Sequence, residues 1–574
     1  MGGGEGTAAA LRRCAGRLGA PFTATRDALA NPALRRLQLG WAGSTTGEYI
    51  SVVAFGVVAY EAGGAAAVGL VGVVQMLPAA LLNPVVALLG DRYRREGVVV
   101  VSDLLRAAAM LGAAGAVAVD APVTVLYVLA AALAVAGGAL YPAQMALVPL
   151  LARSAGDVTA ATAASNLVRN TASLAAPASA GVLLMVSSPV ALFAVGAAAF
   201  ALGALVVRAM PPTDGVRLAP AMTGAWRALT EGFRAAASDR GTALVMGLLA
   251  AHGTARGALG VLLVVVPLEL LGLGASGVGF LNATVGVGAF VGAVAVTGLA
   301  GRRCLAAPMG GGLLLTGGSL VVAATLSLTP VVLAAMAVMG VGFALVGITG
   351  STLLVRSARD DVLARVLGVL GTVRAGGMAL GAGLTPVLLG LVGVRWTMAA
   401  VGAAVVAVSL AGRSGLRAID DASALPERQL RLLQKSPVFA ALLPMALERL
   451  ARRMEPLEVT PGMPVLREGE VGDAVLIVAQ GELAVETAAE GEVDRVLSGE
   501  VCGEMALLHD APRNATVRAL TECSLYRLTR DEFLAAVTGH PESAQRAQEL
   551  VEERLAHRRR IAGERRAHSA RIHR

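Results

Sequence analysis

A pattern suited to binding a sugar phosphate lies in the last quarter of this 574-residue chain. It begins with Gly503-Glu504, continues through a short apolar turn, and reaches Arg513 ten residues after the glycine. A glycine lets the backbone come close to a ligand, and the N–H groups of a turn can point at an anion. An arginine offers a planar fork to phosphate oxygens, and a glutamate can accept a hydrogen bond from a ribose hydroxyl. The spacing therefore predicts a sugar-phosphate site.

The same residues resemble a known cassette. Gly503-Glu504-Met505-Ala506-Leu507-Leu508 matches G-E-x-A-L-L, and Pro512-Arg513-Asn514-Ala515-Thr516-Val517 matches P-R-x-A-T-V. In this order and spacing they resemble the phosphate-binding cassette of the cyclic nucleotide-binding domain family. The resemblance implies that Arg513 binds the cyclic phosphate and that Glu504 binds a ribose hydroxyl. The implied nucleotide-binding residues are Gly503, Glu504, Met505, Ala506, Arg513, Asn514, Ala515 and Thr516.

The residue after the arginine leaves the base of the nucleotide open. Asn514 stands where the family commonly has Ala or Thr, at a position that helps some members to favour cAMP or cGMP. We expect cAMP, the commoner bacterial ligand, as a regulatory ligand, and we expect no other cofactor. Some family members keep the fold and lose the ligand, usually together with the arginine or the glutamate; Arg513 and Glu504 are both present.

Composition indicates that most of the chain lies in a membrane. Hydrophobic residues make up 56%, charged residues only 15%, and the mean hydropathy is +0.69, whereas soluble domains carry about a quarter charged residues. The net charge is +8, and almost all of the positive charge comes from arginine, since Lys435 is the only lysine. We therefore interpret the charge as a coding bias and expect no nucleic-acid partner.

The four cysteines have no metal spacing and suggest no disulfide framework. The sequence has no Ser/His/Asp arrangement and no phosphate loop of ATP-driven pumps, so we expect neither an enzyme nor a bound metal.

Apolar runs of about 20 residues, the length that spans a bilayer, occur twelve times. They lie near residues 39–60, 66–89, 97–119, 123–150, 158–187, 189–209, 241–267, 276–300, 305–327, 330–355, 362–392 and 395–413. Arginines concentrate in alternate connections, while the others hold Glu61, Asp120, Glu269 and the single Arg395. The positive-inside rule then predicts that both termini and the C-terminal domain are cytoplasmic, in a multi-pass protein of the plasma membrane.

The predicted spans also repeat. Arg153-Ser154-Ala155-Gly156-Asp157-Val158 leads into the fifth span, and Arg356-Ser357-Ala358-Arg359-Asp360-Asp361-Val362 leads into the eleventh. Asn83-Pro84-Val85-Val86-Ala87-Leu88-Leu89-Gly90-Asp91-Arg92-Tyr93-Arg94-Arg95 follows the second span and resembles the G-x-x-x-D-R-x-G-R-R motif of the major facilitator superfamily. Ser102-Asp103-Leu104-Leu105-Arg106 is similar to its drug- and siderophore-exporter branch. The resemblance implies two six-helix repeats and a secondary transporter that works by alternating access.

Ionisable residues in and beside the spans are the candidates for transport, because such groups in a bilayer face a cavity or a partner. The candidates for transport or gating are Glu48, Asp91, Arg92, Arg95, Asp103, Arg106, Arg169, His252, Arg256 and Arg374. The excess of arginines over acids inside the spans hints at an anionic or zwitterionic substrate.

Each of these candidates has a structural alternative. Glu48 is either a proton-coupling carboxylate or the partner of a buried arginine, and the sequence does not choose between them. We expect Asp103 and Arg106, three residues apart, to form a structural pair. We also expect Arg169 and Arg374 to pack at a gate and His252 to be a hydrogen-bonded packing residue.

The predicted domains follow from these patterns. They are a cytoplasmic segment 1–36, a transporter domain 37–415 with a central cytoplasmic loop 211–240, a linker 416–426, a cyclic nucleotide-binding domain 427–550 and a basic tail 551–574. The expected fold is an all-α membrane domain of twelve helices joined to an α+β domain with a β-roll or jelly roll between flanking helices.

The leading functional hypothesis is proton-coupled efflux of a small molecule, regulated by cyclic nucleotide. One alternative is a membrane-anchored nucleotide sensor that does not transport. Another is a transporter whose C-terminal domain is a ligand-free assembly module. The substrate and the oligomeric state are not predicted.

Overall fold

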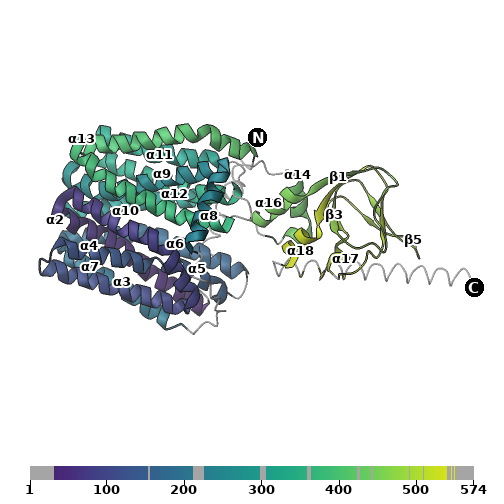
Figure 1. Ribbon diagram of the computed structural model, residues 1–574, viewed down its shortest axis with the longest axis horizontal. Coiled ribbons are helices and arrows are strands. Elements are labelled where there is room, and N and C mark those ends of the chain that lie inside the picture. The colour runs from purple at the N-terminus through teal and green to yellow at the C-terminus, as the bar shows by residue number, and fades with distance from the viewer. Residues whose placement is uncertain are drawn as a thin grey trace, which may run out of the picture. The chain divides into compact units, whose positions relative to one another are not determined.

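A computed structural model describes residues 31–152, 155–210, 225–297, 305–357, 363–422, 427–440, 442, 444–489, 491–508, 510–538 and a few positions between 545 and 552. Some side chains in these ranges, among them 79–80 and 82–92, are also outside the description. By contacts the chain divides into two units, Met1–Ser423 and Ala424–Arg574 (Figure 1).

The first unit is helical throughout its described part. Its helices are α2 (Pro32–Arg92), α3 (Arg95–Ala118), α4 (Val123–Gly137), α5 (Leu140–Leu151), α6 (Ala155–Val186), α7 (Pro189–Arg208), α8 (Ala225–Ser238), α9 (Arg240–Val265), the π-helical turn η2 (Val266–Leu270), α10 (Gly274–Thr297), α11 (Ala306–Leu326), α12 (Thr329–Ser357) and α13 (Leu363–Ala422). Within the described ranges, nine helices or joined helices are long and apolar enough to cross a membrane.

Glycines interrupt the two longest helices. Gly64 has φ +62° and ψ −153° inside α2, and Gly393 has φ +76° and ψ 175° inside α13. Such angles are open to glycine and strained for other residues. An unbroken helix of 61 residues would be about 90 Å long, three times the hydrocarbon thickness of a bilayer. Both glycines fall between pairs of predicted spans, so each of these helices changes direction where the sequence predicts a connection.

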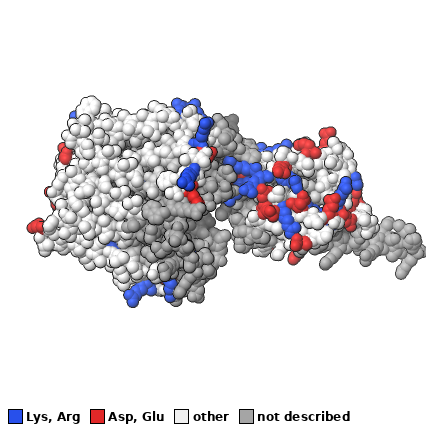
Figure 2. Space-filling view, viewed as in Figure 1, with Lys and Arg blue, Asp and Glu red and all other residues white. Residues whose placement is uncertain are grey.

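Small residues let the helices approach closely, as is typical of membrane helices. A Cβ atom at Gly257 in α9 would collide with the carbonyl of Met378 in α13, and one at Gly288 in α10 would collide with the carbonyl of Ala337 in α12. Over most of the face that Figure 2 shows, the first unit is uncharged. Large apolar side chains such as Leu391 and Trp396 are 75% and 72% exposed, which suits a surface that contacts lipid.

The second unit is α+β. Helices α14 (Glu427–Lys435), α15 (Pro437–Ala440) and α16 (Pro444–Arg453) precede the strands, and α18 (Arg530–Thr538) follows them. The strands are β1 (Glu455–Val459), β2 (Pro464–Leu466), β3 (Ala474–Gln480), β4 (Leu483–Thr487), β5 (Gly491–Val496), β6 (Val501–Cys502), β7 (Thr516–Ala519) and β8 (Cys523–Thr529), with the short helix α17 (Glu504–Leu508) after β6. Acidic and basic side chains mix on its visible surface, as on a soluble domain (Figure 2).

The strands form two antiparallel four-stranded sheets, in the orders β1-β8-β3-β6 and β2-β7-β4-β5. Side chains between the sheets form one core, which includes Val478, Leu483 and Leu525. A second core joins the first sheet to the helices, with Phe439 of α15 edge-on to Phe533 of α18 at 6.1 Å between ring centroids. This confirms a mostly helical protein of apolar helices with a C-terminal β-sheet domain.

The structure adds detail to two sequence-based boundaries. The predicted span 123–150 coincides with the apolar segment Val123–Leu151, which consists of two helices, α4 and α5, on either side of a turn at Gly138-Ala139. The predicted linker 416–426 begins inside α13, which continues to Ala422, and the division between the units lies after Ser423. Residues 1–30, 211–224 and 553–574 of the predicted terminal and central segments lie outside the described residues.

Candidate functional site

The cassette of the second unit lies between β6 and β7, two strands that belong to different sheets. Gly503 follows β6 with φ +88°, and a Cβ atom there would lie 2.6 Å from NH1 of Arg513. Glycine is therefore required twice, once for its backbone angle and once for the space that it leaves. Glu504 opens α17 and is 1% exposed.

Arg513 is buried beneath this turn. Its side chain is 4% exposed and donates from NH1 to the carbonyl oxygen of Gly503 at 2.6 Å and from NH2 to that of Ala474 at 2.5 Å. Asp473, which is itself 69% exposed, approaches it at 3.7 Å. Burial lowers the pKa of Arg513, and the Asp473 carboxylate opposes that shift. An arginine remains charged even so, so the cassette holds a buried cation.

The cavity beside Arg513 has a volume of about 50 Å³, room for roughly four water molecules. Its lining includes the predicted residues Gly503, Glu504, Met505, Ala506, Arg513, Asn514 and Ala515. Asn514 donates from Nδ2 to the sulfur of Met505 at 3.3 Å, across the mouth of the turn. Thr516 does not line the cavity; its hydroxyl oxygen accepts a hydrogen bond from the backbone of Glu468 at 3.1 Å.

Other lining residues of this cavity come from strands far from the cassette in sequence. Val485 belongs to β4, and Asp494 and Val496 belong to β5. Neither these residues nor Ala474 of β3, which anchors Arg513, were predicted from the sequence. Only the pairing of the strands brings them to the turn, so a local motif could not reveal them.

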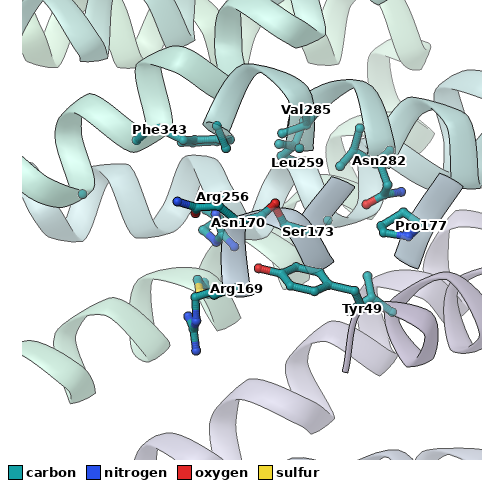
Figure 3. A pocket seen from close by; sticks show the side chains of 18 of the residues that line it. Tyr49, Arg169, Asn170, Ser173, Pro177, Arg256, Leu259, Asn282, Val285 and Phe343 are labelled. Atoms are coloured by element: carbon teal, nitrogen blue, oxygen red, sulfur yellow. The ribbon is translucent and has the colours of Figure 1, made fainter. Parts of the chain in front are cut away.

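The first unit encloses a cavity of about 830 Å³, at the upper end of the range for small-molecule sites. Its lining comes from α2, α6, α9, α10, α12 and α13. The polar lining residues are Tyr49, Gln75, Asn166, Arg169, Asn170, Ser173, Arg256 and Asn282, most of which Figure 3 labels. The remainder is apolar, so the cavity suits a ligand with one polar and one hydrophobic part.

Two of the predicted transport residues, Arg169 and Arg256, line this cavity. The Arg169 guanidinium carbon lies 5.4 Å from the ring centroid of Trp41 and 5.5 Å from that of Tyr141. The Arg256 guanidinium carbon lies 5.7 Å from the ring centroid of Phe343. Aromatic faces stabilise a cation without neutralising it, so both arginines keep their charge available to a ligand.

Arg374 and His252 contact residues that line the cavity but do not line it themselves. Arg374 donates to the Gly347 carbonyl oxygen at 3.3 Å and to the Ser351 hydroxyl at 3.1 Å. His252 is 6% exposed and packs edge-on against Phe343, with 5.0 Å between ring centroids. Neither is among the lining residues in the described part of the chain.

Glu48, Asp103 and Arg106 form a separate charged cluster between α2 and α3. Arg106 lies 3.5 Å from Glu48 and 3.6 Å from Asp103, and the Ser44 hydroxyl donates to Asp103 at 2.5 Å. Asp103 is fully buried, whereas the Glu48 side chain is 44% exposed. The guanidinium carbon of Arg106 also lies 4.2 Å from the ring centroid of Phe200. Glu48 is thus paired with a buried arginine, one of the two roles that the sequence left open.

The motif after the second span is described only in part. Arg95 donates from NH1 to the Ala146 carbonyl oxygen of α5 at 2.8 Å, which ties the start of α3 to α5. The side chains of Asp91 and Arg92 lie outside the described residues.

The sequence analysis did not predict the uncharged cavity residues Tyr49, Asn170 and Asn282. The sequence does not show in which direction a polar residue of an apolar helix faces.

Comparison with known proteins finds a different family for each unit. The model of the Major Facilitator Superfamily matches residues 39–382, more than half of the chain, and the model of the Cyclic nucleotide-binding domain matches residues 456–540. A cyclic nucleotide-gated potassium channel of Rhizobium etli is 35% identical over 127 residues, 22% of this chain and 35% of the channel. The Cyclic AMP receptor protein of Thermus thermophilus is 31% identical over 131 residues, 21% of this chain and 59% of that protein.

Among solved structures, the cAMP-bound regulatory domain of Toxoplasma gondii PKA shares 34% identity, covers 19% of this chain and 43% of that chain, and has a TM-score of 0.19. The chain spans about a third of the length of the channel and three fifths of that of the receptor protein. From residue 39 to residue 382 the match is to a different family. The chain belongs to the major facilitator superfamily and carries a cyclic nucleotide-binding domain in its C-terminal unit.

Proposed function

We propose that this protein is a secondary transporter of a small molecule whose cyclic nucleotide-binding domain regulates the transport cycle. The observation that carries the proposal is the union, in one chain, of a facilitator unit that encloses a cavity of about 830 Å³ and a cassette in which a buried arginine lines a pocket. Facilitators move small molecules by exposing a central site to the two sides of the membrane in turn.

Twelve spans in two repeats fit the helices of the first unit. Gly64 and Gly393 each divide one long helix into two spans, while α4 and α5 together make one. The repeat-related Arg169 and Arg374 stand in α6 and in the first part of α13. With arginines in alternate connections, the positive-inside rule supports cytoplasmic termini in the plasma membrane.

The proposed nucleotide-binding residues are those of the cassette, from Gly503 to Ala506 and from Arg513 to Thr516. Arg513 would exchange the carbonyl oxygens of Gly503 and Ala474 for phosphate oxygens, which are stronger acceptors. The similarity to a cyclic AMP receptor protein supports cAMP as the ligand. A ligand shifts the transport cycle only by binding one conformation more tightly than another, so regulation requires a cassette that differs between conformations.

Proton coupling is proposed at the charged cluster of Glu48, Asp103 and Arg106. Two carboxylates share one arginine there, so one bound proton would leave the cluster neutral. The half-exposed Glu48 supplies a route for that proton, and the buried Asp103 a place to hold it. Efflux is the proposed direction, because Ser102–Arg106 is similar to the exporter branch of the family.

Hydrogen–deuterium exchange on the full chain in lipid nanodiscs tests the regulatory part without a known substrate. We expect saturating cAMP to slow exchange in β6, α17 and β7 and to change exchange at the ends of α6 and α9. The same nucleotide should change neither region in an Arg513→Ala variant. Protection of the cassette with no change in any helix of the first unit would contradict regulation and leave nucleotide binding intact.

A second candidate, a ligand-free assembly module, is favoured by one observation. Both carbonyl partners of Arg513 are already in place and the pocket is only about 50 Å³. Calorimetry of the full chain with cAMP and with cGMP separates the two candidates. Heat with either nucleotide supports the regulatory site, and its absence with both supports the assembly module.

A further inference from the structure

The charge of the central cavity is of one sign. Among the residues that line it in the described part of the chain, Arg169 and Arg256 are charged and none is acidic. The other polar lining groups are amides and hydroxyls, such as those of Asn170, Ser173 and Asn282. These groups both donate and accept hydrogen bonds, so they fit ligands of either charge. The two arginines therefore make the charge of the cavity lining positive.

Neither cavity arginine is neutralised by a carboxylate in the described part of the chain. Arg169 is held by the faces of Trp41 and Tyr141, and its buried Nε atom has no hydrogen-bond partner there. Arg256 is exposed to the cavity and contacts the ring of Phe343. Arg374 lies within electrostatic range of Arg256 and adds a third positive charge near the cavity, although it does not line it.

The carboxylates of Glu48 and Asp103, on neighbouring helices, form ion pairs with a different arginine. Glu48 and Asp103 both pair with Arg106, and neither lines the cavity. An uncompensated cation at membrane depth is costly and marks a site for a counter-charge. A negatively charged ligand can therefore form the ion pair with Arg169 or Arg256 that no carboxylate in the described part of the chain forms.

We propose that the central cavity binds an organic anion whose acidic group is attracted by the positive charges of Arg169 and Arg256 and whose apolar body contacts the hydrophobic lining. This inference rests on the proposed transport function and names the substrate class of that site. Figure 3 shows the side chains of Arg256 and Asn170 near each other, and those of the apolar lining residues Leu259 and Val285 near each other. An amphipathic acid uses both parts, whereas an amphipathic cation meets two like charges.

Trp41 provides a reporter next to the site, because its buried ring contacts the cavity residue Arg169 and the chain has only three tryptophans. In a Trp226→Phe/Trp396→Phe background Trp41 is the sole tryptophan. We would titrate the full chain in nanodiscs with adamantane-1-carboxylate, adamantane-1-carboxamide and 1-adamantylammonium. These probes share one apolar body, differ in charge and do not absorb at the excitation wavelength of tryptophan.

We expect the carboxylate, and not the amide or the ammonium, to change Trp41 emission in a saturable manner. Arg169→Met and Arg256→Met should each weaken the carboxylate at least about tenfold, the equivalent of 1.4 kcal/mol. Arg208→Met is the matched control, since Arg208 is exposed at the end of α7 and does not line the cavity. It should bind the carboxylate as the parent does.

Three results would overturn the proposal. Trp41 emission could respond equally to the three probes, or it could respond to none of them. The carboxylate could also still bind after both arginines are removed. The unfolding temperature of each variant in nanodiscs, compared with that of the parent, verifies that the protein is folded. Because the probe assay needs neither flux nor nucleotide, its failure is distinct from a failure of regulated transport.

Discussion

NH1 of Arg513 lies 2.6 Å from the carbonyl oxygen of Gly503, so the cation of the cassette is bound by the turn that should receive the phosphate. A glycine with φ +88° makes this contact possible. The arginine therefore has two sets of acceptors, the backbone around β3 and β6 and the oxygens of a ligand. A nucleotide must compete with the backbone for the guanidinium.

Arg513→Ala should weaken cAMP binding about 30-fold or more, because loss of one partner of a buried charged hydrogen bond costs about 2 kcal/mol or more. Arg513→Lys should recover little, since an ammonium cannot present a planar fork. Isothermal titration of the full chain measures both. Arg518→Ala is the control, because Arg518 lies on β7, is 40% exposed and does not line the pocket; a similar loss there would mean that the effect is not specific to the cassette.

Gly503→Ala should abolish nucleotide binding and destabilise the domain by about 1–3 kcal/mol, the cost of one strained backbone position. The added methyl group would also displace Arg513, which it would approach to 2.6 Å. Gly499→Ala separates these effects, because Gly499 has φ +95° and a methyl group added there would meet no atom within 4 Å. We expect it to lower the unfolding temperature and to spare binding. Equal loss of binding in both variants would contradict the steric part.

Asp103→Asn should destabilise the first unit by about 3 kcal/mol, because removal of one partner leaves a buried charge poorly compensated. Glu48→Gln should cost less, since the Glu48 side chain is 44% exposed and its loss leaves Arg106 beside the buried Asp103 carboxylate. The unfolding temperature in detergent measures both. A larger effect at Glu48 than at Asp103 would show that Arg106 depends on the exposed carboxylate.

The same cluster should bind one proton. Infrared difference spectra between acidic and neutral pH should show the carbonyl stretch of a protonated buried carboxyl group in the parent protein. The band should vanish in Asp103→Asn or Glu48→Gln and persist in Glu61→Gln, where the acid is exposed and outside the cluster. A band that is unchanged in both cluster variants would exclude this site as the proton carrier.

Asp239 caps the N-terminus of α9, where its side chain accepts a hydrogen bond from the backbone of Thr242 at 2.7 Å. Hydrogen bonds from Thr242 lower the pKa of Asp239 below its ordinary 3.8. A carboxyl group with a lower pKa in the folded state stabilises the fold above its unfolded pKa and loses that effect as pH falls through the folded pKa. Asp239→Ala should therefore cost about 1 kcal/mol at neutral pH.

The cost of Asp239→Ala should shrink below about pH 4. Unfolding temperatures of parent and variant, compared at neutral and acidic pH, check the sign. Asp239→Asn should behave nearly as the parent at neutral pH, since asparagine caps helices equally well. A difference between parent and Asp239→Ala that grows on acidification would contradict the assignment.

Much of the fold could be predicted from local patterns. Apolar runs of bilayer length coincide with the helices, and Gly64 and Gly393 stand where connections were expected, because a hydrocarbon solvent allows few backbone structures. The predicted span 123–150 coincides with one apolar segment, but the turn between α4 and α5 within it was not predicted. Adjacent glycines in an otherwise apolar run do not show whether a helix bends, continues or stops.

The sites could be predicted less completely. The cassette is contiguous, so its spacing was sufficient, whereas Ala474 and Asp494 reach it only through strand pairing. In the first unit the charged residues drew attention, and two of them, Arg169 and Arg256, line the cavity. The cavity residues Asn170 and Asn282 were not predicted, because packing between neighbouring helices decides which side of a buried helix faces a cavity.

The shortness of the turns at Gly64 and Gly393, and of the other connections on the same side, has a practical consequence. In the proposed topology the connections on the outer side of the membrane, including residues 119–122, 187–188, 271–273 and 327–328, are only a few residues long. Such turns present almost no surface beyond the bilayer to antibodies, proteases or glycan-transferring enzymes. An epitope tag intended for detection from outside would have to bring its own spacer, and binding proteins raised against the intact protein would select the cytoplasmic face.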